Sequence, residues 1–531
     1  MHARMRRGGT PGRAHTVPTD WVLAAGVDEE ATHVKQLSGL DSAFLDLEDD
    51  HQFLHVSQLL ILRRPDDPDF EPHPVWRRQL ADRLHQLEPL RRRLVEVPFG
   101  LDHPYWINDP DFDLDFHVRR SAVPPPGSDD DLDELVGRLV AAPMDRDHPL
   151  WVSHVIEGLA PEEEGGPDRF AILTMIHHST IDGAAGADLL ELMLDDVPDA
   201  ESPSHAGEWE AEPPPSTAGV LARAAANGLR RPARGLLLAA RAGQSVARAS
   251  RNPAVIDLAD RVRGSLRGPL GSLLNAGRER DPEQDLPRLP PLVTPPTPFN
   301  APVSRYRRFA HRALPLAEVK AVGKEAGATI NDVVVALCAG GLRHWLLERG
   351  ELPDRPLTAM IPVSLREGAE DEQWTNRVSA TVAALPTDVE DPVERLHVAH
   401  DGLRVAKQVF AALPGELSPD AAGLGVPATV TAVSRALTRW SAVAPAPFNT
   451  VVSNVPGPRE PLYLGGATMT HYIPVSAIAD PVGLNITVQS YVEQLDIGLL
   501  ACAELLPDLH DLADAVVGEF DALRDAVRDG G

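Results

Sequence analysis

Apolar and polar residues recur along the chain with two different periods, which predicts strands and helices in mixed order. The run from Phe170 to Ile176 is apolar except for Thr174, a pattern typical of a buried strand. The segment 484–502 alternates and predicts a hairpin. The segment 509–527 repeats apolar residues every three or four positions, which predicts an amphipathic closing helix. The pattern by itself shows only that strands and helices are mixed along the chain.

The length of the chain predicts two domains, because 531 residues exceed what one hydrophobic core normally supports. Residues 1–34 are basic, lack an apolar segment and are expected to form a disordered extension. A first domain is expected over 35–196 and a second over 303–531. Between them, residues 197–302 are rich in Pro, Ala and Arg, and we expect a crossover linker there.

The charge and cysteine content narrow the class of protein. The formal net charge of −28 argues against nucleic-acid binding, which requires a basic surface. Cys338 and Cys502 lie in apolar segments and predict buried thiols in a reducing compartment. There is no secretory apolar region at the start, and no apolar run reaches the roughly 18 residues that span a bilayer. We therefore expect a cytoplasmic protein, with any contact to the inner membrane or lipid droplets peripheral.

Reactive side chains follow the apolar run directly, in the stretch HHSTIDG at 177–183. Neighbouring strand residues point to opposite sides, so one of His177 and His178 is expected to face a substrate while the other packs inward. A neutral imidazole is a suitable general base near neutral pH. Asp182 could orient the motif, or it could only cap the following helix. The strand–turn–helix context favours a catalytic motif over a buried core histidine.

A second candidate group lies at the start of an apolar helical segment, TINDVVVA. Thr329 and Asp332 match a T-x-x-D capping box, and Gly350 matches the position just past a helix end. Asn331 would then lie in the first helical turn, where free N–H groups and the positive end of the dipole suit a developing negative charge. The alternative is that Asn331 and Asp332 only cap the helix.

HHSTIDG resembles the HHxxxDG motif of the CoA-dependent acyltransferase superfamily. Further stretches, in the same order as in that family, narrow the resemblance to the bacterial wax ester synthase/diacylglycerol acyltransferase (WS/DGAT) family. They are LSGLDSAFL at 37–45, PLW at 149–151, INDVVVA at 330–336, PVSLR at 362–366, SNVPGP at 453–458, PLYLGGA at 461–467 and LNITVQSY at 484–491. The resemblance implies a two-domain α/β fold similar to chloramphenicol acetyltransferase, with mixed sheets, flanking helices and a channel between the domains.

The resemblance also implies transfer of a long-chain fatty acyl group from acyl-CoA. The acceptor would be diacylglycerol, giving triacylglycerol, or a long-chain alcohol, giving a wax ester. In the implied mechanism His178 is the general base, His177 and Asp182 hold the turn, and Asn331 stabilises the oxyanion. Acyl-CoA is a substrate, and neither a cofactor nor a metal is implied. The residues that the family pattern places in substrate binding are Gly183, Arg366, Ser453 and Asn454, with Arg366 also a partner for Asp182.

Two alternative interpretations stay open at this stage. One is an acyltransferase of the same fold with a different acceptor, and the other is a catalytically retired protein of lipid surfaces. A separate question concerns 219–251, where arginines from Arg223 to Arg248 would fall on one face of a helix. This arginine stripe could contact anionic lipid or CoA phosphates, or it could be a solvated face of a crossover helix.

Overall fold

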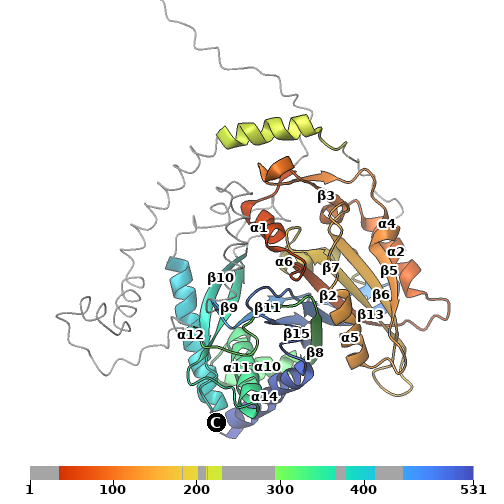
Figure 1. Cartoon of the computed structure of the whole chain (residues 1–531). Coiled ribbons are helices and arrows are strands. Elements are labelled where there is room, and N and C mark those ends of the chain that lie inside the picture. Colours follow the sequence, from red (N-terminus) through yellow and green to blue (C-terminus); the bar gives the residue numbers. More distant parts are fainter. Residues whose placement is uncertain are drawn as a thin grey trace, which may run out of the picture. The chain divides into compact units, whose positions relative to one another are not determined.

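Two six-stranded mixed sheets with helices against them make up most of the described chain (Figure 1). The α/β class implied by the family resemblance is confirmed. The expected extension 1–34 and most of the expected crossover 197–302 lie outside the described residues. This computed structural model describes residues 35–181, 183–200, 211, 213–229, 294–364, 378–412 and 446–529.

The first sheet is built mainly from the N-terminal half of the chain. Its strands, in spatial order, are β12 (Tyr463–Leu464), β13 (Ala467–Val475), β2 (His55–Arg63), β7 (Arg169–His177), β6 (Trp151–Leu159) and β5 (Val118–Ala122). Neighbouring strands run antiparallel except β5 and β6, which are parallel. The helices that pack with this sheet are α2 (Pro72–Arg83), α5 (Asp129–Leu139) and α6 (Gly183–Met193).

The interior strand β7 is buried, as its apolar run predicts. Phe170 and Ile172 belong to a core that includes residues of α2 and α6. Ala171 and Leu173 belong to another core, which includes residues of α5 and of the second sheet. Alternate residues of one strand therefore contribute to two cores, which explains why the run contains no polar alternation.

The second sheet is built from the C-terminal half. Its strands, in spatial order, are β10 (Val378–Leu385), β9 (Leu357–Ser364), β11 (Thr450–Pro456), β14 (Leu484–Tyr491), β15 (Gln494–Cys502) and β8 (Arg307–Pro315). β11 runs parallel to both of its neighbours, and β14 and β15 form the predicted hairpin. Its helices are α10 (Leu316–Glu325), α11 (Ile330–Glu348), α12 (Pro392–Ala412) and α14 (Leu509–Asp529).

The long helix α11 contributes heavily to the core of the second half. The predicted capping box is confirmed, because the Asp332 N–H donates to Thr329 Oγ1 at 3.3 Å and the Thr329 N–H donates to the Asp332 carboxylate at 2.8 Å. Gly350 follows the helix with a φ of +65°, as predicted. By length and composition α11 could cross a membrane, but 72% of its apolar window is buried, as in a core helix of a folded domain.

Shorter elements complete the N-terminal half. A helix over 217–229 docks on them where Asn227 Nδ2 donates to the Asp102 carboxylate at 2.8 Å. The short helices are α1 (Gly39–Leu47), α3 (Glu88–Arg91), α4 (Leu114–His117) and the 3₁₀ turn η1 (Pro98–Gly100). A three-stranded sheet has the order β1 (Lys35–Gln36), β4 (Tyr105–Asn108) and β3 (Arg92–Val95).

The two halves share a sheet, which the hydrophobic pattern did not predict. β12 and β13 come from the C-terminal half of the sequence but belong to the first sheet, where β13 pairs with β2. β13 also approaches β15 of the second sheet very closely. A Cβ atom added at Gly498 of β15 would lie 1.9 Å from the carbonyl oxygen of Pro474 in β13.

Substitution of this glycine should destabilise the junction, because the obstructing atom is backbone and cannot rotate aside. For Gly498→Ala we expect a loss of about 2–3 kcal/mol in the free energy of unfolding, within the range of overpacked cores. Gly518→Ala in α14 is the control, since nothing lies within 4 Å of its added Cβ, and helix propensity favours alanine there. Urea unfolding measures the stability of both variants. Equal unfolding midpoints for Gly498→Ala and Gly518→Ala would contradict the close approach of β13 to β15.

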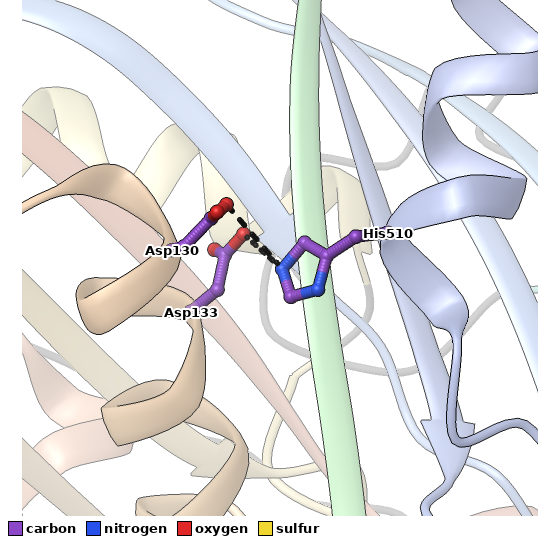
Figure 2. A group of neighbouring side chains, drawn as sticks. All are labelled: Asp130, Asp133 and His510. Atoms are coloured by element: carbon purple, nitrogen blue, oxygen red, sulfur yellow. Dashed lines mark hydrogen bonds and ion pairs between the residues drawn. The ribbon is translucent and has the colours of Figure 1, made fainter.

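A cluster of charged side chains around the buried Asp133 also joins the halves. Figure 2 shows Asp130 and Asp133 of α5 beside His510 of α14, and His311 of β8 belongs to the same cluster. Asp133 is fully buried, and its carboxylate accepts His311 Nδ1–H at 2.5 Å, the His311 backbone N–H at 3.1 Å and His510 Nε2–H at 3.2 Å. Asp130 lies 3.7 Å from the same His510 nitrogen. Asp130, Asp133 and His510 bring potential metal ligands within 4.8 Å, but hydrogen bonds from the histidines occupy both Asp133 oxygens and account for the arrangement.

The ionisations in this cluster are coupled. Burial raises the pKa of Asp133, but the charge and hydrogen bonds of the two histidines outweigh it and hold that pKa below its ordinary value. Burial lowers the pKa of His311, but the Asp133 carboxylate reverses this and raises it. The hydrogen bond to Asp133 raises the pKa of His510 as well. The cluster is therefore an ionic link when the histidines are protonated.

This link should make the stability of the protein depend on pH. A histidine with a raised folded pKa stabilises fully below its unfolded pKa, about 6.5, and loses that contribution as pH rises through the folded value. We expect the difference in melting temperature between wild type and Asp133→Asn to be largest near pH 5–6 and to shrink above pH 7. Asp514→Asn, which removes the carboxylate facing the non-titrating Arg312, is the control. A difference that does not vary with pH would contradict the ionic link.

Candidate active site

The histidine motif sits in the turn that joins β7 to α6. β7 ends at His177, and the Thr180 N–H donates to the His177 carbonyl at 2.9 Å to close the turn. Gly183 is the first residue of α6. Asp182 lies outside the described residues, so its predicted orienting role stays a prediction. The predicted strand–turn–helix context of the motif is confirmed.

His177 points inward and is buried, with 1% of its surface exposed. Its Nδ1 atom accepts the Ser179 N–H at 3.1 Å and lies 2.7 Å from the Ser179 hydroxyl. The ring proton therefore sits on Nε2, which lies 3.1 Å from Oε1 of Glu48. A carboxylate thus fixes the tautomer and the orientation of His177, as in other carboxylate–histidine pairs.

Glu48, at the C-terminal end of α1, is a site residue that the sequence analysis missed. Its carboxylate also accepts the Leu54 N–H at 2.9 Å and Arg146 Nη2 at 3.0 Å. Burial raises its pKa, but the hydrogen bond and charge of His177, with the other donors, lower it to about 2. Glu48 is therefore ionised at neutral pH. The sequence feature that could have identified Glu48 is its position, three residues after the family stretch 37–45.

Backbone contacts hold both histidines in place. The His178 N–H donates to the Leu54 carbonyl, and the His177 N–H donates to the carbonyl of Leu150, in the PLW stretch, both at 2.9 Å. Because Leu54 also donates its own N–H to Glu48, one carboxylate touches His177 directly and supports His178 through a single intervening residue.

His178 is the histidine that keeps part of its surface exposed. Its ring stacks on Phe44 of α1, with the ring centroids 4.2 Å apart and the planes 10° apart. Its Nδ1 atom is enclosed by protein. The nitrogen that a substrate could approach is therefore Nε2, and the position suits proton exchange with a bound hydroxyl.

The candidate residues of the second half lie on α11 and β11. Asn331 is partly buried in the first turn of α11, as the second residue after the N-cap Thr329. Ser453 and Asn454 are partly buried on β11, opposite Thr487 and Val488 of β14. β11 lies against both α6 and α11, so this strand contacts the helix of the histidine motif and the helix of Asn331. Arg366 lies outside the described residues.

Comparison with known proteins decides the family. The chain matches the model of the wax ester synthase/diacylglycerol acyltransferase catalytic domain over residues 37–334. It matches the model of the C-terminal domain of the same family over residues 374–524. The chain belongs to the WS/DGAT family. The resemblance carried by HHSTIDG and the other stretches is thereby confirmed, and the protein is an acyltransferase.

Individual relatives agree with this assignment. A Mycobacterium tuberculosis protein named as a diacylglycerol O-acyltransferase is 35% identical over 481 residues, covering 91% of this chain and 88% of the relative. A Mycobacterium bovis protein with the same kind of name is 35% identical over 493 residues, covering 92% and 98%.

Solved structures confirm the expected two-domain fold. The wax ester synthase/diacylglycerol acyltransferase of Marinobacter aquaeolei VT8 is similar with a TM-score of 0.61 and 28% identity, covering 93% of this chain and all of that one. The first condensation domain of the CDA synthetase has a TM-score of 0.53 at 16% identity, covering 94% and 97%, and shares the fold.

Removal of the Glu48 carboxylate should damage the motif, because the His177 and Leu54 N–H groups would lose their buried acceptor. For Glu48→Ala we expect a loss of about 2–4 kcal/mol in unfolding free energy and a loss of acyl transfer at temperatures where the protein is folded. Glu96→Ala is the matched control, since Glu96 faces the same Arg146 at 3.7 Å but is exposed. Chemical unfolding and activity assays compare the two variants with the wild type. A Glu48→Ala protein with wild-type stability and wild-type activity would contradict the role of this carboxylate.

Proposed function

We propose that this acyltransferase moves a long-chain fatty acyl group from acyl-CoA to diacylglycerol, to a long-chain alcohol, or to both. The observation that carries the proposal is the partly exposed His178, beside a His177 held inward by Glu48, in a chain of the WS/DGAT family. Relatives named for diacylglycerol O-acyltransferase activity support diacylglycerol, and the Marinobacter protein named for both activities supports a long-chain alcohol.

His178 acts as the general base in the proposed mechanism. Its Nε2 atom takes the proton of the acceptor hydroxyl while the hydroxyl oxygen attacks the thioester carbonyl of acyl-CoA. The new C–O bond forms and the C–S bond breaks. The protonated imidazole then gives its proton to the departing thiolate, so the products are the ester and free CoA. The Glu48–His177 contact supports this role because it fixes the turn that carries His178.

Developing negative charge needs donors on the opposite side of the reacting carbonyl. We assign this task to the first turn of α11 with Asn331, because free N–H groups and the positive dipole end lie there. Gly183, Ser453 and Asn454 are assigned to substrate binding. Arg366 is assigned as the partner of Asp182, which would tie the histidine turn to the second half. Acyl-CoA serves as a substrate, with no cofactor and no metal.

The proposed place of action is the cytoplasmic surface of the membrane or of lipid droplets, where long-chain acceptors partition. The arginine stripe of 219–251 is the proposed contact with anionic lipid. Residues 219–229 belong to the docked helix over 217–229, and the rest of the stripe lies outside the described residues.

Loss of the general base should abolish most of the reaction. We expect His178→Ala to lower the release of free thiol from palmitoyl-CoA, in the presence of dioleoylglycerol or hexadecanol, by about 10²- to 10⁴-fold. His344→Ala is the matched control, because that histidine is on α11 with 63% of its side chain exposed. Near-normal turnover in folded His178→Ala would overturn the assignment. If the folded wild-type protein releases no thiol with dioleoylglycerol and none with hexadecanol, the result would point to another acceptor or to a retired site.

A further inference from the structure

Helix α1 contacts both histidines of the motif. Phe44 stacks on the ring of His178, and Glu48, four residues later, reaches His177. Phe44 lies in the last turn of α1 and Glu48 is its C-cap, so the C-terminal end of this helix serves both rings. We propose that Phe44 is a positioning residue for acyl transfer, which holds the imidazole of His178 in its reactive orientation. This inference rests on the proposed role of His178 as general base.

The helix that carries Phe44 is fixed independently of this contact. Ser38 caps its N-terminus by accepting the Asp41 N–H at 3.1 Å. At the other end, Arg146 Nη2 donates to the Leu45 carbonyl at 2.8 Å and to Glu48. Leu45 anchors the helix in a small core, whose other buried members are Leu37, Leu94, Trp106 and Leu150.

Phe44 itself is not needed to build that core. Leu45 has 5% of its surface exposed, whereas Phe44 keeps part of its surface open beside a histidine that is also partly exposed. The fold therefore places an aromatic ring at the edge of the site, although its neighbour supplies the anchoring contact. The near-parallel planes, 10° apart, show that the ring meets His178 face to face.

Such a stack suits a general base for two physical reasons. It covers one face of the imidazole and restricts ring rotation, but the two nitrogens lie in the ring plane, so the stack does not cover Nε2. The face of a phenyl ring carries negative charge density, which attracts the imidazolium that forms as the proton is taken. Phe44 therefore favours both the orientation and the charged state that the reaction requires.

The test separates the aromatic face from the apolar bulk. Phe44→Leu keeps an apolar side chain but removes the ring, Phe44→Tyr keeps the ring, and Leu47→Ala changes an exposed residue of the same helix. We expect Phe44→Leu to lower kcat about tenfold, with the KM for palmitoyl-CoA changed less than about twofold. Phe44→Tyr and Leu47→Ala should stay within about threefold of wild type. Melting temperatures should be similar in all four proteins.

Two further measurements would stay unchanged if Phe44 only stabilised the fold. In the pH profile of kcat, the acidic limb of Phe44→Leu should shift to lower pH, because the imidazolium loses its attractive partner. In NMR spectra of protein labelled at the histidine rings, the His178 resonance, assigned by its loss in His178→Ala, should move downfield in Phe44→Leu. It should stay in place in Leu47→Ala.

Each outcome decides the inference. Wild-type kcat, an unshifted pH profile and an unmoved His178 resonance in Phe44→Leu would overturn it. If Phe44→Leu and Phe44→Tyr lose kcat and melting temperature to the same extent, the inference would also be overturned, because Phe44 would then act only through packing. If wild type shows no acceptor-dependent thiol release, the proposed function fails, but the NMR comparison still tests whether Phe44 stacks on His178.

Discussion

The buried contact between the Glu48 carboxylate and the His177 ring is the interaction around which the site is arranged. An ionised carboxylate with little access to water is costly unless donors surround it, and here His177, Leu54 and Arg146 supply them. Those same donors fix α1, the segment before β2 and the end of β7 against one another. The partly exposed neighbour, His178, is held by the same network, because its N–H donates to the carbonyl of Leu54.

The second constraint is the way the halves are joined. β13 completes the first sheet with chain from the second half, and the Asp133 cluster ties α5 to β8 and α14. Because these contacts are hydrogen-bonded and buried, they limit how far the sheets can shift. β11 lies against both α6 and α11. A strand of the second half is therefore next to the helix of the histidine motif.

Local features of the fold were predictable from the sequence. The strand at 170–176, the hairpin at 484–502 and the capping box of α11 depend on residues close together in the chain, and all three are confirmed. The exchange of β13 was not predictable, since its alternating pattern would fit either sheet. Glu48 and Phe44 were missed for a similar reason, because their partners lie about 130 residues away in the sequence. The pairing of Asp182 with Arg366 stays a prediction.

The sequence by itself determined the motif at 177–183, the family and, through the family resemblance, the α/β class, because residue spacing in short motifs carries that information. Through the family resemblance it implied His178 as the general base, but it left open what holds either ring in place. Only the tertiary structure decided this, by placing Glu48 against His177 and Phe44 against His178. The physical reason is that burial and hydrogen-bond partners are set by contacts between distant segments, whereas strand and helix patterns are set by neighbours along the chain.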